Sequence, residues 1–236
     1  MTICKYVREG ANSRLAEARE LLVNIKNEEP QEGVPRPPTP LSSALRGLMY
    51  VSLYGAIEYA VTHGVQCFIN HMCGLKVSTK HLESSLYSIA LNSQLESARG
   101  GAERRKWEAR RAIFVGVDSE IVCSIPDTVF GGFLHNVYPK TVLEIFLCLG
   151  ISKPATISES EIGYLNEITE KRNAVAHGRE TATEAGKGLS VKDLELRLSV
   201  LYSACSYFLD VIEEHALELR FVKLQYRAGY QEKAAG

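Results

Sequence analysis

One short segment of the chain combines side chains that suit acid–base chemistry at a phosphate. The segment KRNAVAHG (171–178) contains Arg172, Asn173 and His177, followed directly by Gly178. An imidazole titrates near neutral pH and can take or give a proton, and a guanidinium offers forked donors to phosphate oxygens. Asn173 lies one helical turn before His177, so its amide can hydrogen-bond the imidazole. Arg172, Asn173 and His177 are therefore the candidate catalytic residues of this chain, and no cofactor is expected.

A helix has to hold these side chains in place. Ser158 with Glu161 three residues later has the pattern of a capping box, which predicts that a helix starts here. Gly178 suits the left-handed position that ends a helix. The sequence therefore predicts a helix over residues 159–177 with the imidazole at its C-terminal end.

Arg172 falls near the middle of the apolar face of this predicted helix. A buried guanidinium without a partner is costly, so either this face is partly open to water or a carboxylate lies opposite. Glu58 is the candidate carboxylate, because it is the only charged residue between Arg46 and Lys76. Glu58 can equally bond the hydroxyl of Tyr54, four residues earlier. Both alternatives stay open, and both residues are predicted to support the site.

The remaining pattern predicts an all-α bundle with an additional N-terminal helical arm. Residues 42–73 are apolar nearly all round, which is typical of a central buried helix. A second capping-box pattern, Ser190 with Asp193, starts the last long helix. At most, short strands are expected near residues 115–125. The predicted helices span residues 11–27, 42–73, 79–98, 102–114, 139–150, 159–177 and 191–217.

Proline usage divides the chain into parts. Five of the eight prolines lie between positions 30 and 40, which predicts an extended spacer. We therefore expect an N-terminal helix and spacer over residues 1–40, a helical domain over 41–218 and a C-terminal tail over 219–236.

Composition indicates a cytoplasmic protein with only local contacts to nucleic acid. The chain has 27 basic and 28 acidic residues and a formal net charge of −1. Its six cysteines are scattered without a CxxC pair, which favours reduced thiols over disulfides. No secretory signal and no membrane span are expected.

One segment is locally basic, AERRKWEARRAIF (102–114). Arg104 and Arg105 can hold phosphates while Trp107 stacks a base, so all three are candidates for RNA binding. The alternative is a solvated helix face on which Arg104 pairs with Glu108. Two further RNA-binding candidates, Lys171 and Arg179, flank the catalytic pattern.

A metal site on the long buried helix is weaker as a prediction. His63, Cys67 and His71 share a helix face at spacings of four residues. Residues eight apart rise about 12 Å along a helix, so at most two of the three reach one ion. No metal ligand is therefore predicted.

The segment KRNAVAHG resembles the signature of the HEPN superfamily (higher eukaryotes and prokaryotes nucleotide-binding domains). Its ribonuclease members carry an arginine, a polar residue, a few further residues and a histidine, and Arg172, Asn173 and His177 match this order. The long helix with Tyr54 and Glu58 and the long final helix also fit. The resemblance covers roughly residues 42–217.

This resemblance implies a helical bundle that forms a homodimer, with the two Arg–His motifs facing each other across a cleft. It implies metal-independent cleavage of single-stranded RNA, in toxin–antitoxin or phage-defence settings, with an antitoxin protein as a possible partner. Some members carry a tyrosine two residues after the histidine that an antitoxin enzyme modifies, and this chain has Arg179 there. The alternative is a non-catalytic module that binds a partner, a nucleotide or RNA within a larger complex.

Overall fold

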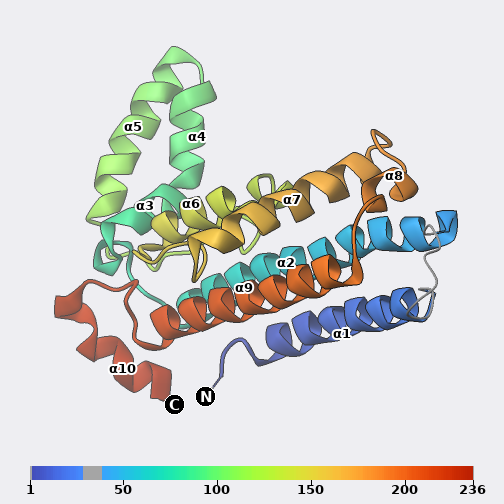
Figure 1. Ribbon diagram of the computed structural model, residues 1–236. Helices are drawn as coiled ribbons and strands as arrows, with labels where there is room; N and C mark the ends of the chain where they lie inside the picture. The colour runs from blue at the N-terminus through green and yellow to red at the C-terminus, as the bar shows by residue number, and fades with distance from the viewer. Residues whose placement is uncertain (1, 29–38, 236) are drawn as a thin grey trace.

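The computed structural model describes residues 2–28 and 39–235, and this part of the chain contains helices and no β-strand (Figure 1). The all-α prediction is confirmed. The long helices are α1 (Lys5–Asn27), α2 (Pro40–Gly74), α7 (Glu159–Ala176) and α9 (Val191–Leu217). The shorter ones are α3 (Tyr87–Ala90), α4 (Asn92–Gly100), α5 (Glu103–Val117), α6 (Pro139–Leu149), α8 (Ala182–Gly186) and α10 (Ala228–Ala235). Four 3₁₀ turns join them: η1 (Thr79–His81), η2 (Ser84–Leu86), η3 (Phe133–His135) and η4 (Leu224–Tyr226).

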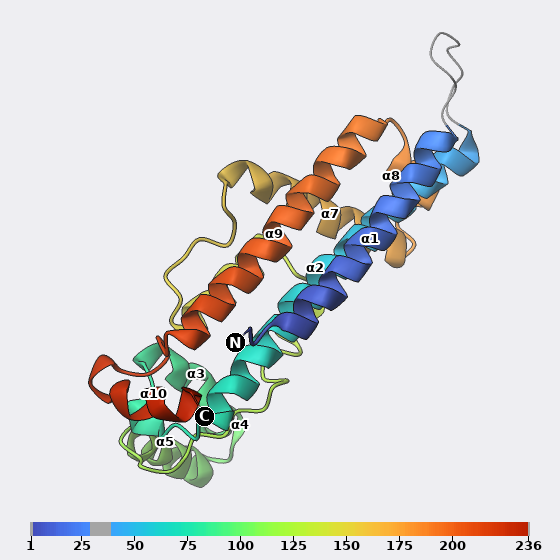
Figure 2. The same ribbon diagram turned by 90° about the horizontal axis from the view of Figure 1, so that it is seen from below.

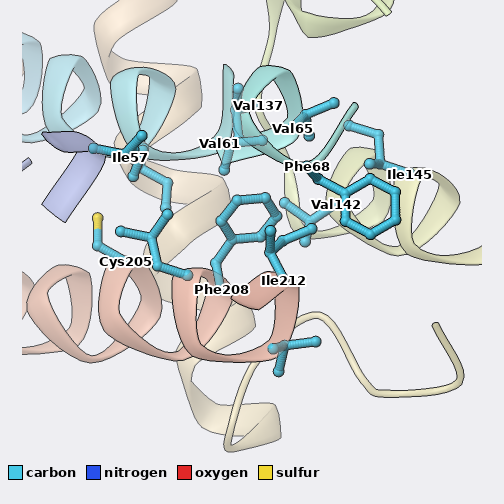
Figure 3. Close-up of a cluster of buried hydrophobic side chains, with 14 of the residues drawn as sticks. Ile57, Val61, Val65, Phe68, Val137, Val142, Ile145, Cys205, Phe208 and Ile212 are labelled. Carbon is cyan, nitrogen blue, oxygen red and sulfur yellow. The ribbon is translucent and has the colours of Figure 1, made fainter. Parts of the chain in front are cut away.

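Helix α2 is the central element, as predicted. Thr39 caps its first turn by accepting a hydrogen bond from the backbone of Ser42. Of its 35 residues 17 are buried, so the helix needs cover on more than one side. Helices α1, α7 and α9 lie beside it in both views (Figures 1 and 2). In the core, side chains of α2, α6 and α9 meet: Ile57, Val61, Val65, Phe68, Val142, Ile145, Phe208 and Ile212 (Figure 3).

Helix α1 packs against α2 and α9 and starts six residues before the predicted position 11. The additional turns are anchored by Arg8, which pairs with Asp210 at 2.6 Å and Glu213 at 2.9 Å. Gly10 lies within these turns, under the ring of Tyr59. A larger residue would not fit there, because an added Cβ would lie 2.4 Å from the Tyr59 hydroxyl. The proline-rich spacer that follows falls on residues 29–38, outside the described part of the chain.

The prediction of one helix over residues 79–98 was wrong. The chain instead forms η1, η2, α3 and α4 in turn. The cause is pairing with distant backbone, because an isolated β-bridge joins Ser78 to Val122. A second bridge joins Leu82 to Val222. The first bridge accounts for the extended piece expected near residues 115–125.

The segment expected as a C-terminal tail and the segment between the predicted helices 159–177 and 191–217 both contain ordered elements. Residues 219–235 include η4 and α10, and Leu219, Phe221 and Val222 are fully buried. Residues 178–190 include α8, which starts at a capping box formed by Thr181 and Glu184.

Helix α8 lies on the first turns of α2 through two glycines. A Cβ added at Gly47 would lie 1.8 Å from the carbonyl oxygen of Ala182, and one added at Gly186 would lie 1.9 Å from that of Ser43. The two backbones therefore approach as closely as only glycine permits. This contact carries the chain from the end of α7 to the start of α9.

In the described residues, no helix combines the length and apolar character that crossing a membrane requires.

We expect Gly47→Ala to lower the free energy of unfolding by about 1–3 kcal/mol, because the new methyl group would meet backbone that has to move. Urea unfolding measures the change. Gly55→Ala is the matched control in the same helix, since no atom lies within 4 Å of its added Cβ. That control should be neutral or stabilise by up to about 1 kcal/mol. Equal losses in both variants would contradict the close contact with α8.

Candidate functional site

Helix α7 places the predicted reactive residues at its C-terminal end. His177 is the C-cap residue, and Gly178 follows with a φ of +68°, in the left-handed region. The backbone N–H of Arg179 then donates to the carbonyl of Ala174 at 2.8 Å, which closes the last turn. The predicted end of the helix is therefore correct, and it leaves the imidazole exposed.

Helix α7 starts at the predicted residue, but the predicted capping box does not form. Ser158 is the N-cap, but its hydroxyl accepts from the backbone of Ser160. Glu161, expected to complete a capping box, is buried and accepts a hydrogen bond from Ser203 on α9 at 2.9 Å. The carboxylate thus joins two helices instead of closing one.

Arg172 lies between α7 and α2 with several partners. Its guanidinium carbon lies 4.1 Å from the centre of the Tyr54 ring, a cation–π contact. Its Nη2 lies 3.6 Å from Oε1 of Glu58, and its Nη1 donates to Oδ1 of Asn173 at 2.8 Å. The side chain keeps 22% of its surface exposed. The structure has the ion pair with Glu58, and Glu58 also lies within reach of the Tyr54 hydroxyl, so the two alternatives left open by the sequence are not exclusive.

A segment that the sequence showed only as loop completes this cluster. Asn173 donates to Oδ1 of Asn136 at 2.7 Å. The Tyr54 hydroxyl accepts from the backbone N–H of Val137 at 3.1 Å and donates to the carbonyl of His135 at 3.4 Å. Burial raises the pKa of Tyr54, so the hydroxyl keeps its proton and stays a donor. No pattern in the sequence pointed to Asn136.

The structure brings Asn173 to Arg172 and not to His177. In the described residues, the imidazole of His177 has no hydrogen-bond or ion-pair partner. Arg172 and His177 lie five residues apart, and five residues rotate by about 140° around a helix beyond a full turn. Within one protomer, the guanidinium and the imidazole therefore point to different sides of α7.

A second polar cluster lies on α7, and the sequence analysis missed it. Arg197 of α9 lies with Nη2 at 2.7 Å from both carboxylate oxygens of Glu167. Tyr50 of α2 donates its hydroxyl to the same carboxylate, and burial raises the pKa of Tyr50. Arg197 is only 8% exposed. The sequence did contain a signal for this cluster. Arg197 lies on the apolar face of the helix over residues 191–217, and a guanidinium on such a face needs a carboxylate partner, as argued for Arg172.

A cleft of about 490 Å³ opens beside the Arg172 cluster. Glu58 lines it, and so does His135, whose backbone carries the Tyr54 contact. The other polar residues in its lining come from α1, α2 and the segment before η3, and these include Arg14, His63 and Asp127. Sequence spacing alone does not bring these segments together.

The remaining predicted residues are dispersed. Lys171 pairs with Glu180 at 2.8 Å, and Arg179 is exposed beside it. Arg104, Arg105 and Trp107 lie on α5, at the opposite end of the long helices from α8 (Figures 1 and 2).

Two of the three residues weighed as metal ligands, His63 and Cys67, have other contacts, whereas Nε2 of His71 is buried without a hydrogen-bond partner in the described residues. His63 stacks on Tyr59 with ring centroids 4.0 Å apart, and the Cys67 thiol donates to the carbonyl of Ile3 at 2.9 Å. Burial lowers the pKa of His71. Across residues 2–28 and 39–235, no three His, Cys, Asp or Glu side chains gather where they could hold a metal ion.

Comparison with known families decides the identity of the fold. The chain matches the sequence model of RiboL-PSP-HEPN over residues 13–218. The chain belongs to this HEPN family. The match confirms the resemblance and includes the whole of α2, α7 and α9, so it spans both polar clusters of this HEPN domain. No curated protein and no solved structure matches the chain.

In this HEPN domain, the carboxylates of the two polar clusters on α7, Glu167 and Glu58, should differ in their contribution to stability. Glu167→Gln leaves a nearly buried Arg197 without its counter-charge, so we expect a loss of about 3 kcal/mol in the free energy of unfolding. Glu58 is 36% exposed, so Glu58→Gln should cost about 1 kcal/mol or less. Urea unfolding measures both changes.

A double-mutant cycle of Glu58→Gln with Arg172→Met gives the coupling energy of the second pair. A coupling indistinguishable from zero would mean that this ion pair does not form in solution.

Proposed function

We propose that this HEPN domain is a metal-independent endoribonuclease that cuts single-stranded RNA by attack of the substrate's own 2′-hydroxyl. The observation that carries the proposal is that α7 holds both residues of the motif near its end: Arg172 is fixed by its contacts, and His177 is exposed. Glu58 and Tyr54 position the guanidinium, and Asn173 holds it from the side. No cofactor takes part.

The reaction forms a bond between the 2′-oxygen and phosphorus and breaks the bond from phosphorus to the 5′-oxygen. A base takes the proton of the 2′-hydroxyl, and an acid gives a proton to the leaving 5′-oxygen. The guanidinium stabilises the charge that develops on the phosphate oxygens. The products are a 2′,3′-cyclic phosphate and a 5′-hydroxyl.

We further propose that the active site is completed in a homodimer. One protomer supplies one His177, whereas this reaction uses a neutral imidazole as base and a protonated one as acid. The separation of Arg172 and His177 around α7 supports a site to which two protomers contribute. Lys171 and Arg179 border this site and are proposed to contact the RNA backbone.

The proposed setting is a cytoplasmic toxin or defence effector whose activity an antitoxin protein restrains. Arg179 stands two residues after His177, where a tyrosine would be needed for neutralisation by nucleotide addition. Any antitoxin would therefore act in another way.

A second candidate function is a non-catalytic module that binds RNA, a nucleotide or a partner protein. It is favoured by the contacts of Arg172, whose charge Glu58 already balances and whose ring contact with Tyr54 holds it against α2. Activity measurements on variants of the motif discriminate between the two functions.

We expect the purified protein to cut single-stranded RNA in the presence of EDTA. His177→Ala and Arg172→Ala should each lower the rate by at least ~100-fold, because each removes an acid–base or charge-stabilising group. Gel analysis of a labelled RNA measures the rates. A strict requirement for a divalent metal, or full activity of His177→Ala, would contradict the mechanism.

The substrate provides the matched control. A single 2′-deoxy substitution at the cut site removes the attacking hydroxyl, so cleavage at that bond should stop while neighbouring cuts continue. Cleavage of the substituted bond would show that water or a protein group attacks instead.

Subunit mixing tests the composite site. If both imidazoles serve one reaction, a dimer with one His177→Ala subunit should be inactive. An equal mixture of wild-type and variant subunits after exchange should then retain about a quarter of the wild-type activity, since random pairing leaves that fraction of intact dimers. A retained activity of one half would show that each protomer works by itself.

A further inference from the structure

Helices α4 and α5 form a hairpin that extends away from the bundle (Figure 1). Its turn needs glycine at Gly101, where an added Cβ would lie 2.7 Å from the carbonyl oxygen of Ser97. The base of the hairpin is held by Gly116, which lies against the side chain of Leu91. Ala109 is the one buried residue of α5, so most of this helix faces solvent.

The outer face of α5 combines two aromatic rings with two arginines. Trp107, Arg110, Arg111 and Phe114 follow the spacing that puts residues on one side of a helix. Trp107 is 65% exposed and Phe114 is 77% exposed. The guanidinium carbon of Arg110 lies 4.7 Å from the centre of the Trp107 ring. We call these four residues the α5 face.

The hairpin has a positive net charge, although the net charge of the whole chain is close to zero. Residues 92–117 contain six basic and three acidic side chains, although the whole chain has a net charge of −1. Two neighbouring cations of α5 outside this face are paired. Arg104 lies 3.8 Å from Glu108, which is the ion pair that the sequence offered as the alternative to RNA binding, and Lys106 lies 3.2 Å from Glu103.

The arginines of the α5 face have no such carboxylate. In the part of the chain that the structure describes, Arg110 and Arg111 form no ion pair. Their charge is therefore available to an anion from outside. Arg105, another exposed arginine of α5, points about 160° away from Trp107 around the helix.

We infer that the α5 face binds single-stranded RNA, with bases stacked on Trp107 and Phe114 and phosphates held by Arg110 and Arg111. Exposed aromatic rings beside guanidinium groups are the combination that holds a flexible nucleic-acid strand. Trp, Phe and Arg are also enriched at protein–protein interfaces, so the residue types alone do not identify the occupant. The charge does, because Arg110 and Arg111 form no ion pair in the described residues and residues 92–117 have three more basic than acidic side chains. Charge complementarity therefore favours a polyanion as the occupant.

The inference deepens the proposed function by adding a substrate-holding surface remote from His177. The hairpin and the end of α7 lie at opposite ends of the long helices (Figures 1 and 2). An interaction made equally by bound substrate and transition state changes KM and leaves kcat unchanged. The α5 face is accordingly a binding surface and has no part in the chemical step.

The chain offers a direct probe, because Trp107 is its only tryptophan. A 2′-O-methyl oligoribonucleotide of about 12 nucleotides is long enough for such a surface, and it lacks the attacking hydroxyl. Titration with this strand should quench the tryptophan fluorescence in a saturable way. Added salt should reverse the quenching, because phosphate contacts release counterions.

Variants locate the contact. Trp107→Ala, and Arg110→Ala combined with Arg111→Ala, should each weaken binding of a fluorescein-labelled 2′-O-methyl strand by about 5-fold to 100-fold in anisotropy titrations. Arg99→Ala is the matched control, since it removes one exposed arginine from α4, the other helix of the hairpin. This control should change binding less than twofold.

The outcomes separate this inference from the proposed ribonuclease. Quenching without any RNA cleavage supports the α5 face and contradicts the catalytic proposal. Cleavage with unchanged KM in Trp107→Ala, or no quenching, overturns the α5 face alone. An Arg99→Ala effect as large as that of the arginine pair also overturns it. So does a dimer that Trp107→Ala dissociates in sedimentation while strand binding persists, because the face would then be a protein interface.

Discussion

Helix α2 is apolar around most of its circumference, so its faces have to be covered by other parts of the chain. Helices α1, α7 and α9 cover its length, and α8 covers its first turns through the close contact at Gly47. The same helix carries one acidic residue, Glu58, which is 36% exposed and has an arginine as its partner. Arg172 of α7 is that partner. The packing of α7 on α2 thereby places Arg172 of the motif beside Glu58 and Tyr54.

Two arginines approach α2 from different sides, and their exposure separates their roles. Arg197 is almost fully buried, and both oxygens of Glu167 bind one of its nitrogens, so its donors serve to join α2, α7 and α9. Arg172 keeps more of its surface open, and its partner Glu58 lines a cleft. A guanidinium needs solvent-accessible donors to bind a phosphate, and those of Arg197 are buried. Arg172 is therefore the arginine suited to a ligand.

The sequence by itself determined the features that depend on local chemistry. Helix α6 runs from Pro139 to the residue before Gly150, which has a φ of +79°. Helix α9 starts at the capping box of Ser190, as expected. Caps and left-handed glycines act within a few residues, so a short window contains all the atoms involved. The Glu58–Arg172 pair was also within reach, since a lone charge on an apolar helix has few possible partners.

The tertiary structure decided whatever depends on segments distant in sequence. A helical pattern over residues 79–98 gave way to backbone pairing with two far segments, because those hydrogen bonds form only once the chain has folded. Glu161 turned from a cap to Ser203 of α9, and Asn173 turned from His177 to Asn136. In each case, a polar side chain bonds a partner from a segment distant in sequence, so the residues near it in the sequence do not reveal that partner. The sequence could name the residues of the motif, but only the packing of α2, α7 and the 135–137 segment set which of them touch.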